Sequence, residues 1–124
     1  MGAMLAQFEG QKYLNIETYR KTGEPVRTPV WFVIDDGLLY VRTAVTTGKF
    51  KRVRNNPAVK VAPCNFRGVV KGDWVSAEAS VAPAAETDKA YRLLRKKYGI
   101  LYALSETFLK GKTYVVLEIR GKDQ

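Results

Sequence analysis

The chain has 124 residues, of which 46% are hydrophobic and 11% aromatic, and this predicts one globular domain over residues 1–124 and excludes a disordered chain. The 21 Lys and Arg residues outnumber 12 Asp and Glu, and the resulting net charge of +9 favours a negatively charged partner such as a phosphate ligand or nucleic acid. Histidine is absent and Cys64 is the single cysteine, which excludes a Ser-His-Asp triad, a His-ligated zinc site and an intramolecular disulfide.

These absences shape the expected chemistry. We predict no metal site, and we expect any redox chemistry to belong to a bound cofactor. No apolar run approaches the roughly 18 residues of a membrane span, and no signal-peptide pattern is present, so we expect a cytoplasmic protein without a membrane partner. Residues 1–4 could carry an expression scar and are given no structural weight.

The first half of the chain reads as strands. We expect a strand at 11–19, a Gly-Pro turn, and the strongest strand of the chain at 26–34. Asp35-Asp36-Gly37 predicts a hairpin that leads into an antiparallel strand at 38–43. Pro29 lies inside the strongest strand and has no N–H to donate, so it predicts a sheet edge or a bulge whose unpaired donors a ligand can use.

The second half mixes helices and strands. A short helix at 48–55 is ended by Pro57, and its Phe50 and Val53 are spaced to face the core. The remaining expected elements are strands at 58–65 and 73–82, a helix at 86–98, a helical turn or loop at 100–109, and a strand at 113–120. About six mostly antiparallel strands with two or three short helices predict a mainly β protein, a closed or nearly closed β-barrel.

Two segments, 27–31 and 43–49, carry the candidate site. The Asp-Gly hairpin joins the strands that contain them, so we expect them to lie close in space. On a two-stranded ribbon about this turn, Arg27 would lie opposite the region just after Thr43 and would converge with Lys49 near the start of the 48–55 helix.

The start of that helix has the features of a phosphate site. A helix start offers free N–H groups and a partial positive charge. Thr46 and Thr47 add hydroxyl donors, Gly48 allows close approach of the backbone, and Arg27 and Lys49 add positive charge. The equally weighted alternative is a capped basic helix whose charges are solvated.

Three stretches of the sequence resemble a known family. The stretches RTPVWF (27–32), YVRTAVTTGKFKRVRNNP (40–57) and VAPCNFRG (61–68) are similar to the flavin/deazaflavin oxidoreductase superfamily, the split β-barrel proteins related to pyridoxamine 5'-phosphate oxidase. The resemblance implies a six-stranded, mostly antiparallel split barrel of the FMN-binding type. The Pro-Cys-x-x-Arg-Gly stretch resembles the branch that uses the deazaflavin coenzyme F-420 rather than FMN.

The resemblance also implies where such a cofactor binds. Its phosphate would be held by residues matching Arg27, Thr43, Thr47 and Lys49, and its ring would lie along 28–31 at a homodimer interface. The substrate contacts of the pyridoxamine enzymes are not recognisable here, so that activity is not predicted, and no catalytic residue is identified. The expected cofactor-binding residues are Arg27, Thr28, Pro29, Val30, Trp31, Thr43, Ala44, Thr46, Thr47, Gly48 and Lys49.

The favoured hypothesis is therefore a cofactor-dependent oxidoreductase that uses F-420 or FMN for hydride transfer to a small or aromatic acceptor. The first alternative is a basic barrel that binds single-stranded nucleic acid, with Phe66 or Trp74 available for stacking. The second is a carrier that binds a flavin-type cofactor without turnover. The exposed edges of a half-open barrel predict a homodimer. The tyrosines at 91, 98 and 102 are interpreted as core residues, although a tyrosine is one of the few proton donors available.

Overall fold

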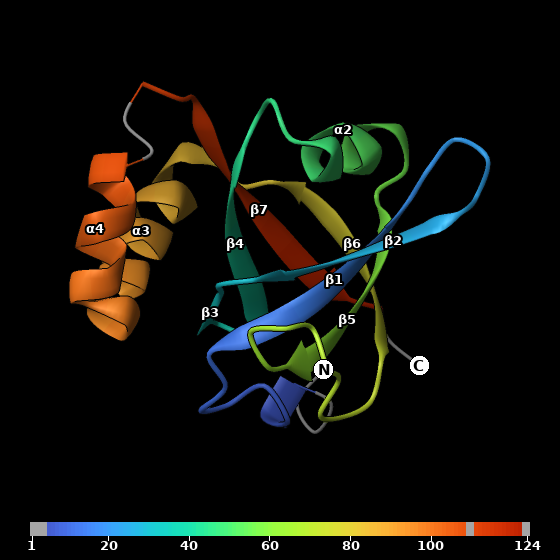
Figure 1. Ribbon diagram of the computed structural model, residues 1–124, viewed down its shortest axis with the longest axis horizontal. Coiled ribbons are helices and arrows are strands. Elements are labelled where there is room, and N and C mark those ends of the chain that lie inside the picture. Colours follow the sequence, from blue (N-terminus) through green and yellow to red (C-terminus); the bar gives the residue numbers. More distant parts are fainter. Residues whose placement is uncertain (1–4, 109–110, 123–124) are drawn as a thin grey trace.

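Seven strands form one antiparallel sheet in the computed structural model, which describes residues 5–108 and 111–122 (Figure 1). The sheet has the order β2-β1-β5-β6-β7-β4-β3. The strands are β1 (Tyr13–Tyr19), β2 (Pro25–Val30), β3 (Val33–Asp35), β4 (Leu38–Ala44), β5 (Ala58–Cys64), β6 (Val75–Val81) and β7 (Tyr114–Gly121). The helices are α2 (Gly48–Asn55), α3 (Ala84–Tyr98) and α4 (Ile100–Phe108).

The sheet is curled into a split barrel. β2 and β3 lie at opposite ends of the strand order, yet only Trp31 and Phe32 separate them along the chain. So short a connection requires the two edges of the sheet to lie near each other. The barrel is therefore nearly closed, and we call the connecting pair Trp31–Phe32 the seam. The predicted barrel is confirmed, but the predicted single strand at 26–34 is wrong because the seam divides it into β2 and β3.

Local sequence signals place the other elements near the positions predicted for them. Asp36 and Gly37 have φ values of 50° and 76°, which is the left-handed backbone of the predicted hairpin turn. α2 spans the predicted residues, and Gly99, with φ of 55°, separates α3 from α4. β2 is an edge strand, as Pro29 predicts.

Two hydrophobic clusters lie on opposite faces of the sheet. The inner cluster fills the barrel, and α2 contributes Phe50 and Val53 to it. The outer cluster joins α3 and α4 to the outside of β3, β4 and β7, with α3 and α4 side by side (Figure 1). Along β4, Val41 belongs to the inner cluster and Tyr40 to the outer one, as the alternation of a strand requires. None of the described helices is long and apolar enough to cross a membrane.

Candidate functional site

The seam is held by side chains of α3 instead of by strand pairing. The Phe32 side chain is fully buried in the barrel, whereas Trp31 stacks on the ring of Tyr98 outside it, with ring centroids 4.4 Å apart and planes 9° apart. The Phe32 N–H donates to the Tyr98 hydroxyl oxygen at 2.9 Å, and Lys97 Nζ donates to the Phe32 carbonyl at 2.9 Å. The Tyr98 hydroxyl in turn donates to the Lys12 carbonyl at 2.7 Å. These bonds replace the ladder that the break removes.

Burial shifts the titration of both α3 side chains. The ammonium of Lys97 lies 3.6 Å from the centroid of the Phe32 ring, and desolvation there lowers the pKa of Lys97 to about 8. Burial raises the pKa of Tyr98 well above its usual value, so its hydroxyl stays protonated and remains able to donate. The seam is therefore fixed by neutral and cationic donors from one helix end.

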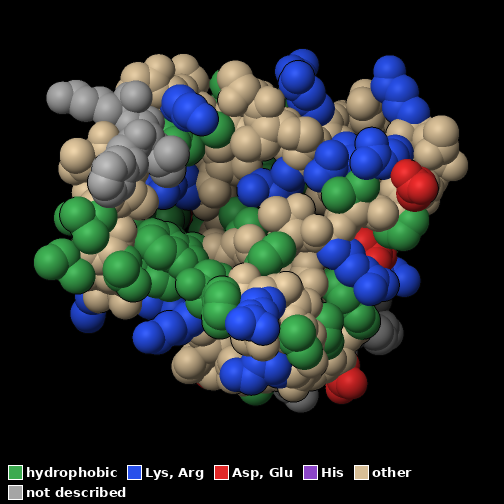
Figure 2. Space-filling view, viewed as in Figure 1, with side chains coloured by type: hydrophobic (Ala, Val, Ile, Leu, Met, Phe, Trp, Pro, Cys, Tyr) green, Lys and Arg blue, Asp and Glu red, His purple; other side chains and the backbone are tan. Residues whose placement is uncertain are grey.

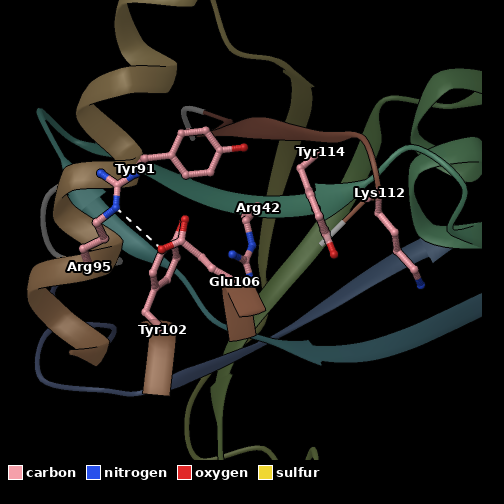
Figure 3. A pocket seen from close by; sticks show the side chains of 8 residues that line it. Arg42, Tyr91, Arg95, Tyr102, Glu106, Lys112 and Tyr114 are labelled. Carbon is pink, nitrogen blue, oxygen red and sulfur yellow. Dashed lines mark ion pairs between the residues drawn. The ribbon is translucent and has the colours of Figure 1, made fainter. Parts of the chain in front are cut away.

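Two neighbouring cavities with common lining residues open beside the seam. The smaller, of about 160 Å³, is lined by Val30, Trp31, Arg42, Leu94 and Tyr102. The larger, of about 270 Å³, shares Arg42 and Tyr102 with it and lies between α3, α4, β4 and β7 (Figure 3). The larger cavity is lined by Arg42, Tyr91, Arg95, Tyr102, Glu106, Gly111, Lys112 and Tyr114. Val30 and Trp31, both expected at the cofactor ring, thus face a cavity.

Arg42 stands at the junction of the two cavities and is held in place by aromatic rings. Its guanidinium carbon lies 4.7 Å from the Tyr102 ring centroid and 5.1 Å from that of Tyr114. Its Nη2 also donates to Ser105 Oγ at 3.1 Å. The cation–π contacts and the hydrogen bond together hold the Arg42 guanidinium where it lines both cavities.

The start of α2 brings several of the predicted residues together. Thr47 is the helix cap: its hydroxyl oxygen accepts from the Phe50 N–H at 3.2 Å, and its hydroxyl donates to the Ala44 carbonyl at 2.8 Å. Thr43 and Thr47 are hydrogen-bonded through their hydroxyls at 3.2 Å. The first helical turn leaves the N–H groups at 48 and 49 without partners within the helix. Thr46 is exposed beside them.

Positive charge gathers at the same helix start. A Cβ built on Gly48 would lie 2.6 Å from Nη1 of Arg52, so the missing side chain at this position makes room for the guanidinium. Arg52 Nε also donates to Thr18 Oγ1 of β1 at 2.7 Å. Burial, together with the charge of Arg52, lowers the pKa of Lys49 to about 8. Free N–H groups beside two cationic side chains suit an anionic group such as a phosphate.

Arg27 does not lie at the position predicted for it from the hairpin. β2 pairs with β1, which places Arg27 opposite Glu17, whereas the strand that pairs with β4 across the Asp36-Gly37 hairpin is β3. Arg27 Nε lies 2.9 Å from Glu17 Oε1, and its guanidinium covers the Trp74 ring at 4.8 Å. Burial opposes ionisation of Glu17, but hydrogen bonds from Tyr19 and Arg27 outweigh it and hold the pKa of Glu17 below its usual value. The expectation that Arg27 lies opposite the region after Thr43 is wrong.

The rest of the β2 segment alternates as a strand does. Thr28 and Val30 are half-buried, whereas Arg27 and Pro29 are exposed on the other face. A similar alternation divides β4, where Arg42 faces the cavities and Thr43 faces the start of α2. One chain therefore presents the Trp31 side and the helix-start side of the candidate site on different faces of β4.

Sequence reasoning missed several residues of this site. Arg42 lies inside the Tyr-x-x-Thr strand, but nothing nearby in the sequence marks the rings that hold it. Arg52 could have been found, because its spacing of four from Gly48 places both on one helix face. Tyr98 and Tyr102 are buried, as their interpretation as core residues predicts, whereas Tyr91 is half-buried and lines the larger cavity.

The curled and divided sheet with helices on its outer face defines a split β-barrel protein with a cavity beside the split. The family model described as pyridoxamine 5'-phosphate oxidase matches residues 1–122, and the chain belongs to that family. The predicted family relationship is thereby confirmed. No curated protein matches the chain.

Solved structures share the fold over nearly the whole chain at low sequence identity. The heme storage protein HutZ from Vibrio cholerae has a TM-score of 0.75 and 14% identity, covering 99% of this chain and 90% of its own. A FAD-binding protein from Mesorhizobium loti has a TM-score of 0.69 and 16% identity, covering 98% and 88%. An F420 reductase has a TM-score of 0.62 and 17% identity, covering 96% and 93%. At these identities the likeness is one of fold.

Proposed function

We propose that this protein is an oxidoreductase that binds F-420 or FMN and transfers hydride to a small or aromatic acceptor. One observation carries the proposal: Val30 and Trp31, the residues that the family resemblance assigns to the cofactor ring, line a cavity together with the cationic side chain of Arg42. The shared fold with a FAD-binding protein and an F420 reductase supports it. When bound, such a coenzyme would supply the hydride, and the protein would orient the ring and exclude water.

The residues present fit an anionic, ring-bearing cofactor. The start of α2 would hold the phosphate through Lys49 and Arg52 and through the N–H groups at 48 and 49, which have no acceptor within the helix. The Trp31 indole, already oriented by its stack on Tyr98, would form one wall for the ring. Arg27, paired with Glu17, would reach such a phosphate only if it left that ion pair.

We further propose that the complete site lies between two copies of the chain. The ring side and the phosphate side are on different faces of β4, and the two cavities of one chain are small for a flavin-sized ligand. Apolar side chains also gather over α4 (Figure 2), where Ile100, Leu101 and Leu104 are 76%, 53% and 49% exposed. Exposed apolar surface of this kind is typical of an interface.

F-420 is the favoured coenzyme. It carries an acidic glutamate tail in addition to its phosphate, and a chain with net charge +9 complements such a tail. The stretch from Pro63 to Gly68, which resembles the deazaflavin branch, begins at the end of β5 and continues into an exposed turn in which Asn65 Oδ1 accepts from the N–H groups of Arg67 and Val69. Arg67 is exposed there and available to an anionic tail.

The test is turnover of the loaded protein. Purified protein is loaded anaerobically with reduced F-420 or reduced FMN, and re-oxidation is followed by absorbance with a panel of quinone, nitroaromatic and conjugated carboxylate acceptors. The proposal expects at least one acceptor to re-oxidise the bound coenzyme faster than it re-oxidises the free coenzyme. A coenzyme that binds but is never re-oxidised would contradict the enzyme and support a carrier.

A further inference from the structure

The larger cavity is lined by cationic, aromatic and acidic side chains. Arg42 comes from β4, Tyr91 and Arg95 from α3, Tyr102 and Glu106 from α4, and Tyr114 from β7 (Figure 3). Lys112, an exposed residue just before β7, also lines the cavity. The distant strand β4 and the consecutive elements α3, α4 and β7 thus converge on a hollow of about 270 Å³, just below the usual range for small-molecule sites.

The charge of this cavity is positive. Its one carboxylate, Glu106, lies 3.9 Å from Arg95 and offsets that cation. Arg42 and Lys112 have no carboxylate within ion-pair distance among residues 5–108 and 111–122. Two uncompensated cations around one hollow favour an anionic ligand.

The aromatic rings define the shape of that ligand. The rings of Tyr91, Tyr102 and Tyr114 stand around the Arg42 guanidinium (Figure 3), and aromatic rings of this kind favour contact with a planar molecule. A guanidinium binds a carboxylate through two parallel hydrogen bonds. Burial raises the pKa of Tyr91, so its hydroxyl remains a donor at neutral pH. A planar ring bearing a carboxylate matches each of these features.

The position of the cavity connects it to the proposed cofactor. Arg42 and Tyr102 line both cavities, so a ligand in the larger one would share these two side chains with whatever occupies the smaller one beside Trp31. We propose that the larger cavity is the acceptor site and that the acceptor is a planar aromatic carboxylate with a conjugated C=C bond. The redox part of this inference rests on the proposed function.

The reaction would balance as a two-electron reduction. One carbon of the C=C bond gains the hydride, and with it both electrons, from the reduced coenzyme. The other carbon gains a proton from solvent or from a tyrosine hydroxyl of the cavity. The π bond is lost, two C–H bonds form, and the coenzyme is left oxidised.

The test is a calorimetric titration of the full-length protein, with and without bound coenzyme, using three probes: cinnamate, its neutral amide, and the non-planar cyclohexanecarboxylate. The inference predicts that cinnamate binds about tenfold more tightly than either of the others. Arg42→Gln and Lys112→Gln should each weaken cinnamate binding by about tenfold and leave the amide unchanged. Arg92→Gln, an exposed position of α3 outside the cavity lining, is the matched control and should change nothing.

The outcomes separate the two proposals. Equal binding of cinnamate and its amide would overturn the acceptor site, and so would undiminished cinnamate binding by Lys112→Gln. Because Lys112 is exposed, that variant keeps the test valid even if Arg42→Gln fails to fold. Coenzyme binding without cinnamate binding would overturn this inference and leave the proposed function standing. Selective cinnamate binding without any coenzyme binding would support the ligand class and overturn the proposed function.

Discussion

Trp31 and Tyr98 stack face to face at 4.4 Å, and through this contact one side chain controls both parts of the seam. The Tyr98 ring orients the Trp31 indole, while its hydroxyl accepts from the Phe32 N–H and donates to the Lys12 carbonyl. The break between β2 and β3 is thus a specified structure and not a loose connection. The position of the Trp31 side chain, which lines the cavity, is therefore set by Tyr98 at the end of α3.

Removing the Tyr98 hydroxyl should destabilise the fold. Tyr98→Phe keeps the stack but leaves the buried Phe32 N–H and the Lys12 carbonyl without this partner, a cost of about 1–3 kcal/mol in the free energy of unfolding. Urea denaturation measures it. Tyr91→Phe is the matched control, expected to stay within about 0.5 kcal/mol. Equal stability of the two variants would show that the hydroxyl does not hold the seam.

Lys49 should make phosphate binding depend on pH near 8. Its pKa is lowered to about 8, so the side chain is cationic below that pH and neutral above it, and an anion loses its partner as the pH rises. The affinity for FMN should therefore fall above pH 8, by up to about tenfold per pH unit. Riboflavin, which lacks the phosphate, should show no such fall when both are titrated between pH 7 and 9.5.

The substitution Lys49→Arg isolates the cause. A guanidinium stays protonated over this whole range, so the variant should keep a flat affinity for FMN across pH 8. Lys49→Ala should bind FMN weakly and equally at every pH. A fall above pH 8 that persists in both variants would assign the titration to another group.

A site shared between two subunits should be recoverable by mixing variants. Lys49→Ala damages the phosphate side and Trp31→Ala damages the ring side. If each site takes Lys49 from one subunit and Trp31 from the other, a mixed dimer carries one doubly damaged site and one intact site. Equimolar mixtures that are unfolded and refolded together should therefore regain wild-type affinity at about a quarter of all sites, since half the dimers are mixed.

Two results would contradict the shared site. Mixtures in which no high-affinity sites reappear, with folded dimers present by sedimentation, would place both residues of a site on the same chain. A monomer at micromolar concentration by sedimentation would remove the interface altogether. Arg92→Ala mixed with Lys49→Ala provides the control for refolding yield.

Local features of this fold could be predicted from the sequence, because they depend on neighbours in the chain. Asp36-Gly37 forms its turn through its own backbone preferences, and Thr47 caps α2 through the N–H three residues ahead. The break at the seam could not be predicted from the sequence, because apolar residues continue through Trp31 and Phe32 and predict an unbroken strand. What divides that strand is Tyr98, 66 residues beyond Phe32.

The same distinction applies to the candidate site. The helix start from Thr46 to Lys49 was predictable because one short segment contains it. The setting of Arg42 depends on the rings of Tyr102 and Tyr114, which reach it only once α4 and β7 have packed beside β4. The predicted position of Arg27 was wrong for a related reason. Pairing across the 35–37 hairpin ends at β3, and the strand that carries Arg27 pairs instead with β1, where Glu17 lies.

The most direct test of the central claim is an equilibrium titration of cofactor-stripped protein with F-420 and with FMN, followed by fluorescence, in the wild type and in Lys49→Ala. We expect at least one coenzyme to bind the wild type at micromolar concentration or more tightly, and Lys49→Ala to bind it at least about tenfold more weakly. Binding of neither coenzyme, or equal affinity in the variant, would contradict this claim and leave this split barrel without its proposed cofactor.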